Sequence, residues 1–173
     1  MKKTFLRSLI CLSLIASACG VKKYEQDFNK FTGRWKLYIV ETKADVDASW
    51  VPRQGDYKNR QGFILYDGLG GMGVHHVTED YQHYVFEGKG GLDSLTRNDL
   101  RHLANNFVYF GKYRVIDSLG IIEHHIESAH SLNLWGTIAA RKYTFMGDTL
   151  VLSPVTDQYP KSRLKWVRLS DLE

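Results

Sequence analysis

Apolar and polar residues alternate through most of the chain after residue 30, and this pattern predicts β-strands. In residues 34–42, Trp35, Leu37 and Ile39 alternate with their neighbours, and a period of two is typical of a strand with one buried face. Short segments of the same kind are separated by polar or glycine-rich turns. They predict further strands at residues 62–66, 72–78, 107–116, 121–128, 136–145, 149–153 and 164–169.

Two stretches interrupt this pattern. Residues 95–105 carry leucines at helical spacing after Ser94 and Thr96, either of which can cap a helix. Residues 81–86 are rich in aromatic side chains and fit either a strand or a lid over the end of a barrel. Eight or nine short strands with one short helix predict an all-β fold, an antiparallel meander that closes as a barrel or folds as a sandwich. An eight-stranded barrel can hold one small ligand.

The first 20 residues have a different pattern, which predicts export. Three basic residues precede an apolar run at 9–15, and small residues then lead to Cys19. This order is that of a secretory signal, and a cysteine after the small residues resembles the bacterial lipobox, in which the thiol is acylated. The run is too short for a transmembrane helix, which needs roughly 20 residues. An ordinary cleaved signal with a chance cysteine is the alternative.

The lipobox interpretation divides the chain into a signal peptide at 1–18, a lipidated tether at 19–30 and a domain at 31–173. It predicts a protein of the bacterial cell envelope that is held at a membrane by its lipid anchor. Gly20 stands where an aspartate retains many lipoproteins at the inner membrane, so we expect the outer membrane if the source is Gram-negative.

Removing the signal also changes the charge and the available chemistry. Three of the 23 basic residues lie before Cys19, which leaves 20 against 19 acidic residues, so the composition gives no reason to expect nucleic acid as a partner. The other cysteine, Cys11, leaves as well, and the domain then has no thiol chemistry. Adjacent histidines on a strand point to opposite faces, so neither histidine pair can hold one ion alone. We expect no metal and no cofactor.

Several motifs resemble the lipocalin-like domain family of bacteria and fungi. Gly33-Arg34-Trp35 is similar to the Gly-x-Trp start of lipocalins and related calycins, and residues 109–115 are similar to a Tyr-Phe-Gly-x-Tyr-x-Val stretch. The segments 122–128, 133–137 and 141–143 resemble its His-His strand, its Asn-x-Trp loop and its arginine-bearing strand. The resemblance covers roughly residues 31–169. It implies an eight- or nine-stranded calycin-type barrel with a central cavity, closed at one end by Arg168 over Trp35.

The alternation also predicts which polar side chains enter the barrel. His124 lies between Ile122 and Ile126 on the apolar face of its strand, so it should point inward and His125 outward. Arg141 shares a face with Tyr143 on the next strand and should also point inward. The predicted ligand-binding residues are Tyr109, Tyr113, His124, Arg141 and Tyr143.

Two interpretations of this polar group remain open. In the first, Arg141 binds a ligand carboxylate or another anion while His124 and a tyrosine orient a carbonyl or hydroxyl. In the second, Arg141 pairs within the protein, either with a carboxylate such as Glu41 or with tyrosine hydroxyls. His76 shares a face with Met72 and Val74, which favours an inward position for this side chain too.

The leading functional hypothesis is binding of a small, largely apolar or amphipathic molecule in the barrel. Isomerase-like or cyclase-like chemistry in the same cavity is the enzyme alternative, because a titratable histidine can move protons. No Gly-x-Ser-x-Gly motif of a hydrolase is present, and we assign no catalytic residue. A third hypothesis is an interaction lipoprotein of the envelope with a packed interior.

Overall fold

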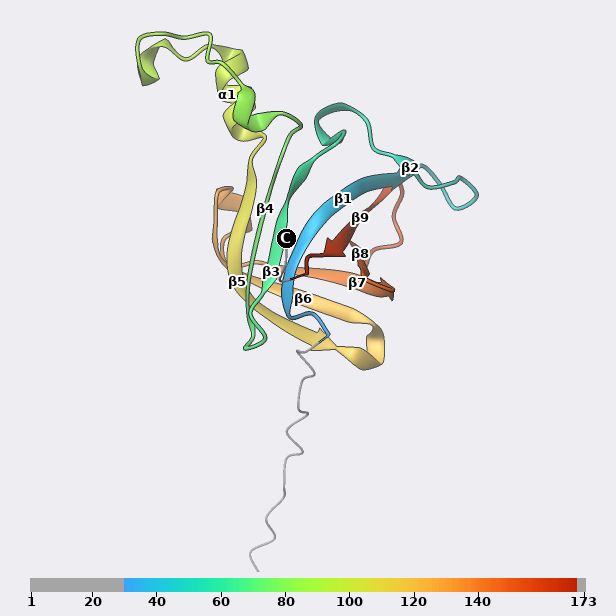
Figure 1. Ribbon diagram of the computed structural model, residues 1–173. Coiled ribbons are helices and arrows are strands. Elements are labelled where there is room, and N and C mark those ends of the chain that lie inside the picture. Colours follow the sequence, from blue (N-terminus) through green and yellow to red (C-terminus); the bar gives the residue numbers. More distant parts are fainter. Residues whose placement is uncertain (1–29, 171–173) are drawn as a thin grey trace, which may run out of the picture.

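The computed structural model describes residues 30–170. Eight antiparallel strands form a closed barrel, in which each strand pairs with the next one along the chain and the last returns to pair with the first (Figure 1). Closure leaves these strands without a free edge. The strands are β1 (Gly33–Lys43), β3 (Gln61–Tyr66), β4 (Gly71–Val77), β5 (Phe107–Ile116), β6 (Ile121–Ala129), β7 (Ile138–Met146), β8 (Thr149–Pro154) and β9 (Lys161–Arg168). The predicted barrel is confirmed.

The remaining elements are short. β2 (Val51–Pro52) pairs with the end of β1 and adds an extra strand outside the closed ring. The helix α1 (Arg97–Ala104) begins after Thr96, whose hydroxyl accepts from the backbone of Asp99 while the Asp99 carboxylate accepts from the backbone of Thr96. Single 3₁₀ turns lie at η1 (Gly55–Tyr57), η2 (Tyr81–His83), η3 (Leu92–Ser94), η4 (Asp117–Leu119) and η5 (Leu132–Leu134).

Residues 78–106, which we call the β4–β5 excursion, leave the barrel between two paired strands and project beyond it with α1 (Figure 1). Its centre is Asp99, which is fully buried and accepts hydrogen bonds from the backbone of Glu87, Gly88 and Thr96. These donors hold the pKa of the Asp99 carboxyl well below its usual range despite its burial. The possible strand at 81–86 does not form, because this segment turns and stacks its tyrosines on His102.

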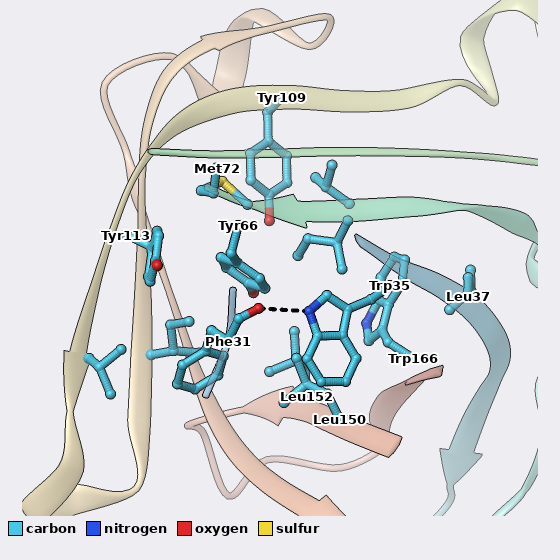
Figure 2. Close-up of a cluster of buried hydrophobic side chains, with 14 of the residues drawn as sticks. Phe31, Trp35, Leu37, Tyr66, Met72, Tyr109, Tyr113, Leu150, Leu152 and Trp166 are labelled. Carbon is cyan, nitrogen blue, oxygen red and sulfur yellow. Dashed lines mark hydrogen bonds between the residues drawn. The ribbon is translucent and has the colours of Figure 1, made fainter. Parts of the chain in front are cut away.

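One end of the barrel, which we call the Trp35 end, is filled by aromatic side chains. The Trp35 indole N–H donates to the Phe31 carbonyl over 2.8 Å, and the ring of Phe31 packs edge-on against Tyr66 (Figure 2). The Arg168 guanidinium lies 4.0 Å from the centre of the Trp35 ring and donates to the carbonyls of Lys30 and Thr32. This is the closure that the family resemblance implies, and it joins the last strand to the entry of the first.

Glycine permits close strand approach at two places near the buried histidines. Gly62 has a φ of 153°, and a Cβ there would lie 2.1 Å from the carbonyl oxygen of His75. A Cβ on Gly111 would lie 2.0 Å from the carbonyl oxygen of His125, beside the point where the β5–β6 register shifts. Larger residues would push these strands apart, so both glycines help to set the inward positions on β4 and β6.

Candidate functional site

The interior contains a cavity of about 280 Å³ at the end opposite Trp35. The cavity is bordered by the C-terminal end of β4 and by the N-terminal ends of β5 and β9. Trp35 lies near the N-terminal end of β1, and Arg168 lies at the C-terminal end of β9. We call the half of the barrel that contains the cavity the cavity end. Its apolar walls include Ile64, Val74, Phe107, Leu152, Leu164 and Trp166. Its polar lining consists of Tyr57, His76, Tyr109, His124, Arg141 and Ser162.

His124 lies at the centre of a buried hydrogen-bonded cluster with two tyrosines. Its Nδ1 lies 2.7 Å from the Tyr109 hydroxyl, and its Nε2 lies 2.9 Å from the Tyr66 hydroxyl. Only 1% of the His124 surface is exposed, as the predicted inward phase requires. Both ring nitrogens are therefore held by protein, and the imidazole cannot rotate without breaking two buried hydrogen bonds.

Burial decides the protonation of this cluster. It lowers the pKa of His124 to about 3, and the nearby charges of Arg141 and His125 act in the same direction. Burial also raises the pKa of Tyr109 to about 12 and that of Tyr66 well above its usual value. At neutral pH the imidazole is uncharged and both phenols keep their protons.

Among residues 30–170, Arg141 is the only formally charged residue that lines the cavity at neutral pH. On the inner face of β7 it is two positions from Ala139, the strand partner of His124. Its guanidinium donates to the Ala140 carbonyl over 2.9 Å, and no carboxylate within residues 30–170 forms an ion pair with it. The internal pairing with Glu41 that the sequence left open is wrong, because Glu41 is held by Arg163 and Lys165.

A second buried histidine, His76, also lines the cavity and is 4% exposed. Its Nδ1 accepts from the Nε–H of Arg60 over 2.6 Å, and Arg60 also donates to the carbonyls of His76 and Asn105. Burial, Arg60 and His75 lower the pKa of His76 to about 3. The sequence indicated the inward phase of His76 but gave no signal for Arg60, which precedes β3 and follows no strand period.

The five predicted ligand-binding residues separate into two groups. Tyr109, His124 and Arg141 meet at the cavity. Tyr113 instead packs in the core against Phe31 and Tyr66, where burial raises its pKa to about 12. Tyr143 lies at the Trp35 end, where its hydroxyl donates to Asp117 and accepts from Lys30. The structure does not bring these last two into the cavity lining.

Residues 30–170 contain no group of three or more histidine, cysteine, aspartate or glutamate side chains placed to hold a metal ion. Within the same residues, no helix has the length and apolar character needed to span a bilayer. Cys19, the signal peptide and most of the predicted tether lie outside the described residues.

The arrangement resembles other small-molecule pockets in having mostly apolar walls and a few placed polar groups. A family model described as a lipocalin-like domain matches residues 32–170, which is nearly all of the described chain. Comparison with curated proteins and with solved structures found no match.

Proposed function

Because this chain belongs to the lipocalin-like domain family, we propose that it binds a small, largely apolar molecule in the barrel. The observation that carries this proposal is the cavity at the cavity end, whose polar lining includes an arginine with no carboxylate partner among the described residues. An arginine in such a position needs an anion or an acceptor to balance it. The volume of about 280 Å³ lies just below the about 300–1,000 Å³ of typical ligand pockets.

The chemistry of the cavity favours binding over catalysis. General acids and bases work best when their pKa lies near the working pH. The histidines at the cavity have a pKa of about 3 and Tyr109 one of about 12. The neutral imidazole of His124 is hydrogen-bonded to two protonated phenols. Such a cluster can hold a polar group in a fixed position for a ligand, but it exchanges protons with the ligand poorly at neutral pH.

Native mass spectrometry tests the proposal directly. The purified protein is incubated with a cell-envelope lipid extract, and we expect a discrete bound mass. Leu164→Trp, which places an indole in the cavity wall, should abolish that mass, while Leu119→Trp on the exposed η4 turn should retain it. An empty wild-type barrel, or equal retention by the two variants, would overturn the proposal.

We also propose that the protein is exported and lipidated at Cys19, on the sequence evidence of the lipobox-like segment. Lipidation would hold the domain at a membrane of the cell envelope. Metabolic labelling with an alkyne fatty acid should give a labelled protein that Cys11→Ser keeps and Cys19→Ser loses. Label that persists in Cys19→Ser, or no label in the wild type, would contradict lipidation at this residue.

A further inference from the structure

The cluster of Tyr66, His124 and Tyr109 has more hydrogen-bond donors than its own acceptors can satisfy. A neutral imidazole has one N–H donor and one bare nitrogen acceptor. Of its two hydrogen bonds, to Tyr66 and Tyr109, the imidazole therefore accepts one and donates the other, so one hydroxyl donates to the ring and the other accepts from it. Two phenols and one imidazole carry three protons for two hydrogen bonds, so one O–H has no acceptor within the cluster.

Burial identifies the hydroxyl that keeps the spare proton. Tyr66 is 0% exposed, and within residues 30–170 its hydroxyl has no hydrogen-bond partner other than His124. A buried donor without an acceptor is unfavourable, so Tyr66 donates to Nε2. His124 then carries its proton on Nδ1 and donates to Tyr109, which lines the cavity. The Tyr109 O–H is left to donate to whatever occupies the cavity.

The second histidine is fixed in the opposite tautomer. Arg60 donates to Nδ1 of His76, and a guanidinium has no acceptor to offer in return. The proton of this neutral imidazole is therefore on Nε2. Among residues 30–170, no hydrogen bond from Nε2 of His76 to an acceptor is formed, and the ring borders the cavity.

Two more hydrogen-bond donors at the cavity end, Trp166 and Arg141, have fewer acceptors among the described residues than they can use. Trp166 lines the cavity, is 1% exposed, and its indole N–H has no acceptor among residues 30–170. A buried tryptophan N–H usually has one. In the part of the chain that the structure describes, the Arg141 guanidinium has only the Ala140 carbonyl as an acceptor. The two remaining polar lining residues, Ser162 and Tyr57, both contact Arg53, which donates to the Ser162 hydroxyl and stacks on the Tyr57 ring. Arg53 is therefore a third cation near the cavity, after Arg60 and Arg141.

We propose that the cavity selects an amphipathic monocarboxylate, whose head group accepts from the Tyr109 O–H, the His76 Nε2–H and the Arg141 guanidinium. This inference rests on the proposed binding function and adds the chemical class of the ligand. A carboxylate accepts several hydrogen bonds and donates none, and it matches the planar fork of arginine. An ammonium would face the positive charge of Arg141, and an alcohol would satisfy fewer of the donors.

Titration calorimetry with three probes of equal chain length tests the class. Decanoate, decanol and decylamine share one apolar chain, and we expect decanoate to bind at least about 10-fold more tightly than the other two at neutral pH. Equal or better binding of decanol or decylamine would overturn this inference and leave the proposed binding function standing. Failure of all three probes to bind would count against both, because the three probes share an apolar chain that the proposed function expects the apolar walls to bind.

Matched variants separate the head-group contacts from the apolar walls. Arg141→Met should weaken decanoate by about 10- to 100-fold and Tyr109→Phe by about 10-fold, with less than about 3-fold effect on decanol. The exposed residues Arg97 and Tyr38 supply the controls Arg97→Met and Tyr38→Phe, which should leave decanoate binding unchanged. Equal losses for decanoate and decanol would show that the variants disturb the cavity as a whole.

The tautomers can be measured without any ligand. Long-range ¹H–¹⁵N correlation spectra should show His124 protonated on Nδ1 and His76 protonated on Nε2 at neutral pH. His124 protonated on Nε2 would remove the free Tyr109 donor, and the inference would fall even if the barrel binds apolar molecules.

Discussion

The two ends of this barrel use similar residues for different purposes. At the Trp35 end, Arg168 is held against an indole ring and two backbone carbonyls, and the aromatic rings around it fill the interior. At the cavity end, Arg141 has one backbone acceptor and faces about 280 Å³ of open space. The difference shows that the acceptors beside an inward arginine decide its role. An arginine with several protein acceptors stabilises the barrel, whereas one with few acceptors is available to bind a ligand.

Lowering the pH should give the largest effect, because both buried histidines belong to the cavity end. Their pKa is about 3 in the folded protein against 6.5 for the ordinary side chain, so the unfolded chain binds protons first. The stability from neutral burial is therefore complete above pH 6.5 and is lost progressively as the pH falls towards 3. Each histidine should contribute about 1.4 kcal/mol of loss per pH unit in this window.

Urea denaturation at a series of pH values measures this slope. His124→Gln should roughly halve it, since one of the two neutral histidines is gone, whereas His130→Gln at an exposed site should leave it unchanged. A slope that is the same in all three proteins would show that His124 is not the group that titrates on unfolding.

The paired variants Arg168→Met and Arg141→Met compare the two ends directly. Loss of Arg168 removes charged hydrogen bonds to the carbonyls of Lys30 and Thr32 and a cation–π contact, and should cost about 2–4 kcal/mol. Loss of Arg141 removes a half-buried charge without a carboxylate partner and should change stability by less than about 1 kcal/mol. Chemical denaturation checks both, and equal destabilisation would erase the distinction between the two ends.

The smallest effect on the barrel should come from Asp99→Asn. This change removes the carboxylate that organises the β4–β5 excursion, but residues 78–106 do not line the cavity. We expect faster proteolysis and hydrogen exchange within the excursion, with little change in barrel unfolding. Asp93→Asn, at an exposed position in η3, is the matched control. Loss of the cooperative barrel transition would show that the excursion supports the barrel.

The period-two pattern was sufficient to predict the strands and the inward positions of His124 and Arg141. These properties depend on neighbouring residues within one strand. The pattern could not predict the positions of Tyr113 and Tyr143 along the barrel axis, because these positions depend on strand tilt and on the register of all eight strands. Both tyrosines have the inward phase but lie nearer the Trp35 end than the cavity.

Other features depend on contacts that no local pattern contains. Arg60 reaches His76 from the segment before β3, and β2 is a two-residue pairing that includes a proline. The segment 81–86 has the composition of a strand. The backbone N–H groups of Glu87 and Gly88, directly after this segment, donate to the Asp99 carboxylate, and these hydrogen bonds stabilise a turn instead. For Arg60 and for the segment 81–86, a polar partner from elsewhere in the chain decided the outcome.

The β4–β5 excursion begins and ends at adjacent points of the barrel. His76 and Phe107 are direct partners in the β4–β5 ladder, and the residues between them leave and return there. Exchanging this insertion for a short turn would remove no strand pairing from the barrel and would shorten the loop that must be closed on folding. His76 and Phe107 also border the cavity, whereas residues 78–106 do not. A grafted loop would therefore change the surroundings of the cavity, including the Asn105 carbonyl that accepts from Arg60, without replacing any residue of the polar lining.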